Sequence, residues 1–391
     1  MKKIICLVVI TSLTITLLVS LVQAQDKQWL QYHSSREARQ SVGSTGSQSM
    51  KSTTERPEGV ELPVLKDNEP LFFKWSSPMA NNGHLLMAID RTSASGAHNL
   101  LYIDSDGDGD LKDETVIEAY RTNSTHAYFG PVKVTFEGED GPITYHLNLS
   151  LCDHGPRTLF ARSGCWYEGT VTVDGAKRHC MLIDYNANGT FDDKSINAND
   201  CDRIRIGEEG SKDIGFVGNY IEVDNKLCRL EIARDGAYVK LVAAEDVTFG
   251  TIRLSETITE FAAGGENGLF TPKPEKGTGS LPVGRYRINY WAIERKDNAG
   301  KNWRLQGSIF SEKGDFDITA DKETELSISE PIISTLEARR SGSGYSFSQN
   351  LQGRLGERIE LTRDGAQPPA PKLHIKSKDG TYDRTFSFEY G

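Results

Sequence analysis

The sequence predicts an all-β fold: an antiparallel β-rich N-terminal domain with two Asp-rich loops, followed by one or two β-sandwich modules. From Val60 onward, apolar and polar residues alternate with period two, which is typical of strands that bury one face. Asp-Gly pairs separate several of these segments, as they do in tight hairpins. No long segment has the apolar period of a helix.

The clearest hairpin is predicted at residues 132–151. Residues 132–136 alternate between apolar and polar, residues 138–141 contain two glycines and two acidic residues, and residues 145–151 alternate again. Two more hairpins are predicted at the Asp-Gly pairs 174–175 and 235–236, because this dipeptide favours the turn that joins two antiparallel strands.

The N-terminus predicts export to the periplasm or the extracellular space. Two lysines precede an apolar run at residues 4–22, and Val22 and Ala24 are small residues at the positions that a signal peptidase reads, so Gln25 is the expected mature start. An uncleaved anchor is the alternative, since 19 residues just suffice to span a bilayer. The Ser and Thr residues of the run and the cleavage site favour cleavage, which leaves no membrane span.

The net charge limits the expected binding partners, and the cysteine content limits the expected disulfides. The formal net charge of −10 argues against nucleic acid, whose binding needs a basic surface, and fits cation binding better. The expected partner is an extracellular or envelope ligand, either carbohydrate or protein. An odd number of cysteines remains after cleavage, so two disulfides and one thiol are possible, with the pairing left open. These residues are Cys152, Cys165, Cys180, Cys201 and Cys228.

Composition divides the chain into five segments. Residues 1–24 are the predicted signal peptide, and residues 25–58 are rich in polar residues and lack apolar periodicity, as in a flexible lead-in. Residues 59–246 form the β domain with both Asp-rich loops. Residues 247–330 and 331–391 are the two sandwich-like modules, which carry no cluster of charged residues with a recognisable chemistry.

The first Asp-rich loop runs from Asp104 to Glu114 and holds six carboxylates with one lysine. A divalent cation would remove the repulsion among them. Oxygens at positions 1, 3 and 5 converge if the chain turns sharply, and Gly109 at position 6 permits that turn. Leu111 at position 8 is expected to hold the loop on the core. The predicted ligands are Asp104, Asp106, Asp108, Asp110 and Asp113.

The second loop begins 80 positions later and repeats the pattern, with Asp or Asn at positions 1, 3 and 5 and Gly189 at position 6. Its two asparagines lower its charge and its expected affinity. Asp200 and Asp202 are possible additional ligands. The alternative for both loops is an ordinary turn that needs no metal. The predicted ligands are Asp184, Asn186, Asn188, Thr190 and Asp193.

Residues 104–113 and 184–193 both resemble the EF-hand calcium loop, of the kind found in exported bacterial β-proteins with Asp-rich calcium loops. They depart from it at position 12, where Thr115 and Ser195 stand in place of glutamate, and the residues before each loop predict strands. The resemblance implies one or two structural Ca²⁺ ions, held with an affinity on the order of 10⁻⁵ to 10⁻³ M. It does not imply the helix pair of a calcium sensor.

The sequence therefore predicts an exported, non-catalytic, calcium-stabilised β-protein that acts in binding or as an envelope or extracellular structural component. It contains no nucleophile elbow, zinc-protease or phosphate-loop motif. The alternative is an exported hydrolase of polysaccharide or peptide that uses the calcium loops as structural braces, because two of its many carboxylates could form a catalytic pair.

Overall fold

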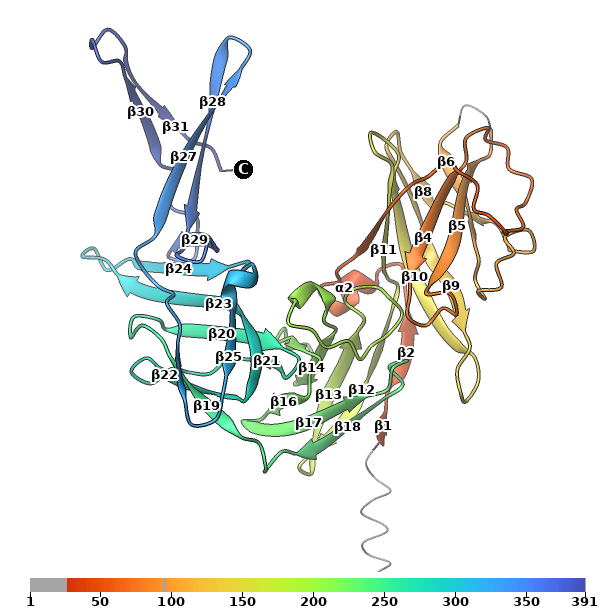
Figure 1. Cartoon of the computed structure of the whole chain (residues 1–391), viewed down its shortest axis with the longest axis horizontal. Helices are drawn as coiled ribbons and strands as arrows, with labels where there is room; N and C mark the ends of the chain where they lie inside the picture. The colour runs from red at the N-terminus through yellow and green to blue at the C-terminus, as the bar shows by residue number, and fades with distance from the viewer. Residues whose placement is uncertain (1–26, 94–95, 391) are drawn as a thin grey trace, which may run out of the picture. The chain divides into compact units, whose positions relative to one another are not determined.

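The computed structural model describes residues 27–93 and 96–390, so the predicted signal peptide at residues 1–24 lies outside the described residues. Strands make up nearly all the regular structure, and almost all pairs are antiparallel, which confirms the predicted all-β fold (Figure 1). The described residues form two compact units, residues 27–245 with 266–268 and residues 246–265 with 269–390.

The first unit contains four sheets, one α-helix and one 3-10 helix. The first sheet has the order β1 (Lys27–Trp29), β18 (Tyr238–Ala243), β17 (Lys226–Ile232), β16 (Tyr220–Val223). The second has the order β3 (Gln48–Lys51), β11 (Thr158–Ser163), β10 (Ile143–Cys152), β9 (His126–Phe136), β8 (Arg121–Thr122). The third has the order β15 (Gly215–Phe216), β14 (Arg203–Gly207), β13 (Ala176–Ile183), β12 (Cys165–Val173), β2 (Gln31–Ser34). The fourth has the order β4 (Leu71–Ser76), β5 (His84–Arg91), β6 (His98–Ile103), β7 (Ile117–Glu118). The helices are α2 (Ala38–Val42) and η1 (Ala198–Asp200).

The three predicted hairpins are confirmed. Strands β9 and β10 pair with Val134 opposite Tyr145, so the apolar residues of both strands share one buried face. Asp174 and Gly175 connect β12 to β13 with φ values of 50° and 80°, as a two-residue hairpin turn requires. The Asp-Gly pair at 235–236 lies in the connection between β17 and β18.

All four sheets of the first unit contribute to one apolar core. Trp75 from β4, Leu149 from β10, Leu182 from β13 and Leu230 from β17 are buried in the same cluster. The side chains on the opposite faces of β9, β10 and β11 are half-buried or exposed. The two Asp-rich loops begin where β6 and β13 end, so each loop starts from a strand that is fixed by this core.

Residues 27–51, which the sequence predicted as part of a flexible lead-in, instead supply β1, β2, β3 and α2. Each of the three strands lies at the edge of a sheet, where one neighbour is enough to pair its backbone. Leu30, Ala38, Val42 and Met50 are buried and anchor the segment. Backbone pairing therefore orders a stretch that has too few apolar residues to show a period in the sequence.

The second unit contains three sheets and one 3-10 helix, η2 (Glu312–Gly314). The first sheet has the order β22 (Thr278–Pro282), β19 (Phe249–Arg253), β26 (Glu323–Glu325), of which β19 and β26 are parallel. The largest has the order β21 (Gly268–Phe270), β20 (Glu260–Gly265), β23 (Gly284–Lys296), β24 (Asn302–Ser308), β29 (Arg358–Arg363), β28 (Gly344–Gln352), β27 (Ile333–Ser341), with β25 (Asp315–Ile318) paired to β23. The third pairs β30 (Lys372–Lys376) with β31 (Asp383–Ser387).

The two modules expected at residues 247–330 and 331–391 share the largest sheet. Strand β24 from the first segment pairs along its length with β29 from the second, with Leu305 opposite Leu361. The two segments accordingly belong to one compact unit.

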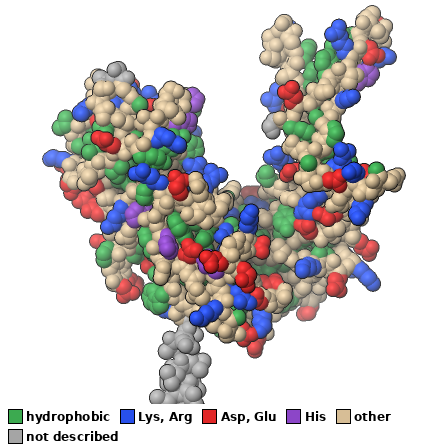
Figure 2. Space-filling view, turned by 180° about the vertical axis from the view of Figure 1, so that it is seen from behind, with side chains coloured by type: hydrophobic (Ala, Val, Ile, Leu, Met, Phe, Trp, Pro, Cys, Tyr) green, Lys and Arg blue, Asp and Glu red, His purple; other side chains and the backbone are tan. Residues whose placement is uncertain are grey.

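Cysteines Cys152, Cys165, Cys180, Cys201 and Cys228 are all free thiols. Cys165 lies in the apolar core and Cys152 is half-buried near His154, with 3.4 Å between the sulfur and Nδ1. In residues 27–93 and 96–390, no helix has the length and apolar character needed to cross a membrane. Acidic and basic side chains are interspersed over the face of the molecule in Figure 2.

Candidate metal centre

The first Asp-rich loop is tied to two neighbouring strands at its start. The backbone N–H of Asp104 donates to the carbonyl of Leu86 on β5 at 3.0 Å, and the carbonyl of Ser105 accepts from Thr135 N–H on β9 at 2.7 Å. Leu111, at position 8, is fully buried in a small apolar cluster with Phe72 and Ala88, as the sequence predicted. The carboxylates between these two anchors are thus held on a short, fixed arc.

Three of the predicted ligands converge. Carboxylate oxygens of Asp104, Asp106 and Asp108 lie within 4.8 Å of one another, with Asp104 buried and the other two exposed. Gly107 and Gly109 turn the chain between them with φ values of 81° and 86°, a region that glycine enters without strain. The arrangement gathers hard oxygen donors around one point, which is the ligand type that Ca²⁺ and Mg²⁺ prefer.

The electrostatics of this loop disfavour its charged form. Burial raises the pKa of Asp104, and the charges of Asp108 and Asp106 raise it further. The pKa of Glu114 is raised by burial and by the charges of Asp106 and Asp104, although Ser105 donates to it from both its backbone N–H and its hydroxyl. The carboxylates therefore carry a repulsion that the described residues leave in part uncompensated, and a cation would relieve it.

The two remaining predicted ligands are not part of the three-carboxylate cluster. The Oδ1 atom of Asp110 accepts from the backbone N–H of Lys112 at 2.7 Å. Burial, followed by the charges of Asp110 and Asp108, raises the pKa of Asp113. Glu114, rather than Asp113, is the acidic residue that hydrogen-bonds back to the start of the loop. Asp104 and Asp108 also line a hollow of about 970 Å³, which gives small solutes access to the loop.

In the second loop, the carboxylate at position 1 accepts hydrogen bonds from nearby residues of the protein. Asp184 is fully buried, and its Oδ1 accepts from the backbone N–H groups of Ala187 at 2.6 Å and Asn188 at 3.3 Å. Its Oδ2 accepts from Gly189 N–H and from the Tyr145 hydroxyl, each at 2.7 Å. Burial nonetheless raises the pKa of Asp184 to about 7, with a further contribution from Asp193.

The other predicted ligands of this loop meet at a single oxygen. The Oδ2 atom of Asp193 accepts from the side-chain amides of Asn186 at 2.8 Å and Asn188 at 2.7 Å, and from the Thr190 hydroxyl at 3.0 Å. All five residues that the sequence named therefore lie in one network. Asparagine can donate as well as accept, so the loop forms a closed set of hydrogen bonds among residues that are also possible ligands.

Asp202 has a larger role in the second loop than the sequence suggested. It is fully buried just before β14 and accepts from Tyr185 N–H and Asp193 N–H, both at 2.9 Å, so it joins the two ends of the loop. Burial and the charges of Asp184 and Asp193 raise its pKa well above the usual range. The acidic character of residues 200–202 was the only signal for it in the sequence.

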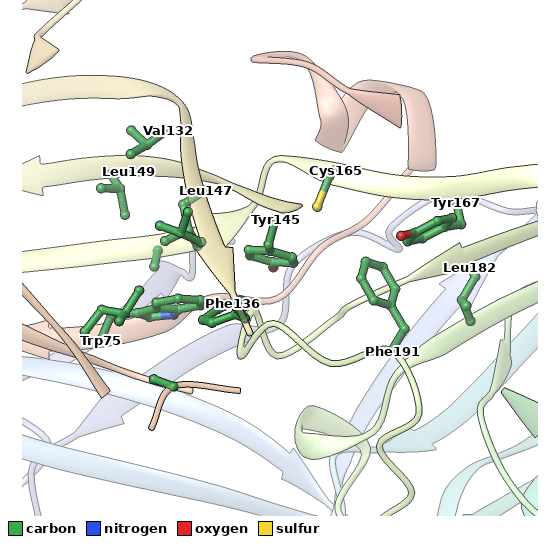
Figure 3. Packing of buried hydrophobic residues seen from close by; sticks show 14 of the residues in the cluster. Trp75, Val132, Phe136, Tyr145, Leu147, Leu149, Cys165, Tyr167, Leu182 and Phe191 are labelled. Carbon is green, nitrogen blue, oxygen red and sulfur yellow. The ribbon is translucent and has the colours of Figure 1, made fainter. Parts of the chain in front are cut away.

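Aromatic residues of the core support the second loop from below. Tyr145 stacks on Trp75 with ring centroids 5.8 Å apart and meets Phe191 of the loop at 6.2 Å (Figure 3). The indole N–H of Trp75 donates to the carbonyl of Ala187 at 2.8 Å. Phe191, at position 8, is buried in the main core. Sequence periodicity indicated that Tyr145 faces the core but gave no sign that its hydroxyl binds Asp184.

No family model, no curated protein and no solved structure matches this chain.

Proposed function

We propose that the protein is exported and non-catalytic, that Ca²⁺ stabilises its first unit, and that it acts in binding or as an envelope or extracellular structural component. The observation that carries the calcium assignment is the convergence of the Asp104, Asp106 and Asp108 carboxylates within 4.8 Å. Hard, multiply charged oxygen donors favour Ca²⁺ over zinc or copper. Export is proposed from the N-terminal sequence, which also places the protein where calcium is abundant.

The first loop is proposed as the main ion site. Two of its three converging carboxylates are exposed, and the loop borders an open hollow, so an ion can enter without unfolding the chain. Burial, followed by the charges of Asp108 and Asp106, raises the pKa of Asp104, and a bound cation would offset this by favouring the charged carboxylates. Glu114, already turned toward Ser105, is close enough in the chain to complete the shell in place of Asp113.

The second loop is proposed as a weaker site. Its Asp193 oxygen already accepts three hydrogen bonds, two of them from amides whose carbonyl oxygens would have to turn inward to bind an ion. A cation there would have to exchange existing hydrogen bonds for coordination. The free energy gained by binding a cation is accordingly smaller than in the first loop, where carboxylates lie close together with fewer hydrogen-bond donors around them.

The role proposed for the ion is structural. Each loop follows a strand of a packed sheet, which supports a fixed site rather than the moving helices of a calcium sensor. An ion that binds the folded loop and not the unfolded chain adds its binding free energy to the stability of the fold. At a free calcium concentration of one hundred times Kd, this contribution is about 2.7 kcal/mol.

The test is thermal unfolding of the mature chain in EDTA and across a calcium titration. We expect a saturable rise in the Tm of the first unit of about 5–10 °C, given about 2–4 °C per kcal/mol for a unit of this size. The Asp104→Asn and Asp108→Asn variants should lose most of this rise. Asp213→Asn, which changes an exposed aspartate of the same unit by the same charge, is the matched control and should respond as the unaltered chain does.

Two results would contradict the proposal. One is a Tm that does not change up to millimolar calcium, which would leave both loops as acidic turns. The other is an equal response in Asp104→Asn and Asp213→Asn, which would indicate general screening of an acidic protein rather than a site. Magnesium at equal concentration separates a selective site from a general divalent effect, because Mg²⁺ sheds its water less readily.

A further inference from the structure

A basic surface lies on the solvent side of the sheet β3-β11-β10-β9-β8. Leu159 and Ala161 of β11 point into the core, so Arg162 lies on the opposite face, and Tyr128 of β9 lies outward for the same reason. Arg121 of β8 is paired with Tyr128 across the strands. We call this region the arginine surface and define it by Arg36, Arg39, Tyr120, Arg121, Tyr128 and Arg162.

Two of these arginines lie over tyrosine rings. The guanidinium carbon of Arg121 is 4.1 Å from the ring centre of Tyr128, and that of Arg36 is 4.5 Å from the ring centre of Tyr120. The two tyrosine rings are 6.3 Å apart, which brings both arginines into one region. The Nε of Arg36 also donates to the carbonyl of Gly130 at 2.7 Å. These contacts hold the planar groups in place before any ligand arrives.

The other two arginines add unrelieved positive charge. Burial and the nearby charge of Arg39 lower the pKa of Arg162, while Tyr128 acts in the opposite direction. This places Arg39, on the exposed side of α2, within electrostatic reach of the sheet face. Like charges gathered at one place cost free energy unless an opposite charge is present.

Some half-buried arginines elsewhere in the protein pair with carboxylates. Arg91 pairs with Asp67 at 2.6 Å, and Arg157 pairs with Asp153 at 3.0 Å. Within residues 27–93 and 96–390, no carboxylate lies within ion-pair distance of any arginine of the arginine surface. On a chain of net charge −10, these four arginines together form a local region of positive charge that an external anion can neutralise.

We propose that the arginine surface binds an acidic polysaccharide, whose carboxylate or sulfate groups pair with the guanidinium edges of Arg36, Arg121 and Arg162. A guanidinium stacked on a ring leaves its N–H edge free for bidentate contact with such a group. An extended glycan with anionic groups at intervals can cross the neighbouring strands and meet arginines that come from β8, β11 and the segment around α2.

Other polyanions fit the surface less well. A peptide would need an apolar groove or a free strand edge longer than the two-residue edge strand β8, and the rest of this surface is a sheet face whose backbone groups are paired within the sheet. Nucleic acid carries a denser charge, which the acidic remainder of the chain repels, and both tyrosine rings already carry a guanidinium on one face. An anionic membrane would require exposed apolar side chains for insertion, and Tyr120 is the only large hydrophobic residue among the six that is exposed.

This inference goes beyond the proposed function, because it assigns a ligand class and a surface that contains none of the proposed calcium ligands. The two can fail separately. The calcium proposal is decided by unfolding, and the glycan proposal by binding of a folded chain with circular dichroism as the check on folding.

The experiment is titration calorimetry of the mature chain with two probes, oligogalacturonate, which supplies carboxylates, and sulfated dextran, which supplies sulfates. Unmodified dextran is the neutral comparison. We expect one or both acidic probes to bind and the neutral one not to bind, with affinity falling as salt screens the ion pairs. Arg121→Gln and Arg36→Gln should each weaken binding about tenfold, since each removes charge-assisted hydrogen bonds.

Arg229→Gln is the matched control, because Arg229 also lies over a tyrosine ring, Tyr220, but outside the arginine surface. It removes the same charge and should leave affinity unchanged. Should Arg121→Gln fail to fold, Arg39→Gln tests the same surface from an exposed helix position. The proposal is overturned if neither acidic probe binds, if Arg229→Gln weakens binding as much as Arg121→Gln, or if only single-stranded DNA or vesicles of anionic lipid bind.

Discussion

Replacing Tyr145 by phenylalanine isolates the contact between the apolar core and the second loop. The Tyr145 hydroxyl donates to Oδ2 of Asp184 at 2.7 Å, and both residues are buried. Phenylalanine keeps the ring that stacks on Trp75 and meets Phe191, so the change removes a hydrogen bond without leaving a cavity large enough to matter. The variant therefore reports on one interaction with a buried carboxylate.

The expected loss of stability is about 2 kcal/mol, because hydrogen bonds to charged groups contribute about 1.5–3 kcal/mol. The Asp184 carboxylate still accepts hydrogen bonds from the backbone N–H groups of Ala187, Asn188 and Gly189, so it loses one hydrogen bond and keeps the others. For a unit of this size, the loss corresponds to a fall in Tm of about 4–8 °C. Urea unfolding in EDTA measures the same quantity as a shift of the midpoint.

The loss should depend on pH in a defined direction. Burial raises the pKa of Asp184 to about 7, while the Tyr145 hydrogen bond works against burial because it favours the charged form. The bond consequently contributes fully above about pH 7, where the folded carboxyl is ionised, and less as the pH falls and Asp184 takes up a proton. We expect the difference between the variant and the unaltered chain to shrink between pH 8 and pH 5.

Tyr167→Phe is the matched control. Tyr167 is buried in the same core and meets Phe191 at 5.2 Å, as Figure 3 shows, but within the described residues its hydroxyl makes no hydrogen bond. Its replacement should cost less than about 0.5 kcal/mol at any pH, as for substitutions that break no specific interaction. Equal losses in the two variants, or a Tyr145→Phe loss that does not change with pH, would refute the assigned role of the hydroxyl.

Two further predictions concern the thiols and a buried histidine. In the native mature chain, a thiol reagent at pH 8 should modify Cys152 alone. Burial raises the pKa of Cys165 and Cys180 to about 12, so these thiols should react only when the chain unfolds. Rapid reaction of more than one thiol in the native chain would contradict this prediction. His98→Leu should lower the free energy of unfolding, measured in urea, by about 2 kcal/mol, because it removes the buried ring that joins Asp153 at 2.7 Å to Asp67 at 3.0 Å. An unchanged midpoint would show that Arg91 and Arg157 alone stabilise these two carboxylates.

The parts of the fold that follow from local chemistry were predictable. The β9–β10 hairpin is encoded by alternation that runs through both strands, and the Asp174-Gly175 turn by the positive φ values that this dipeptide accepts. The same holds for Leu111, the large apolar residue at position 8 of the first loop, which is buried.

Features that depend on distant partners were not predictable from one sequence. Strands β1, β2 and β3 are polar edge strands, whose order comes from backbone pairing with strands far along the chain. Tyr145 reaches Asp184 across 39 positions. Asp202 was predicted as a possible ligand of the second loop, but its hydrogen bonds to the backbone at both ends of that loop were not. A side chain that pairs with one distant atom leaves no period in the sequence.

The same spacing of Asp, Asn and Gly leads to two different electrostatic outcomes. In the second loop, asparagine amides and a threonine hydroxyl donate to Asp193, so the loop can close with its own hydrogen bonds. The first loop has aspartates at the equivalent positions, and these can only accept, so their convergence leaves like charges together. Asn at positions 3 and 5 can thus supply the hydrogen bonds that a loop with Asp at these positions lacks. We therefore propose that calcium, if bound, stabilises the protein mainly through the first loop.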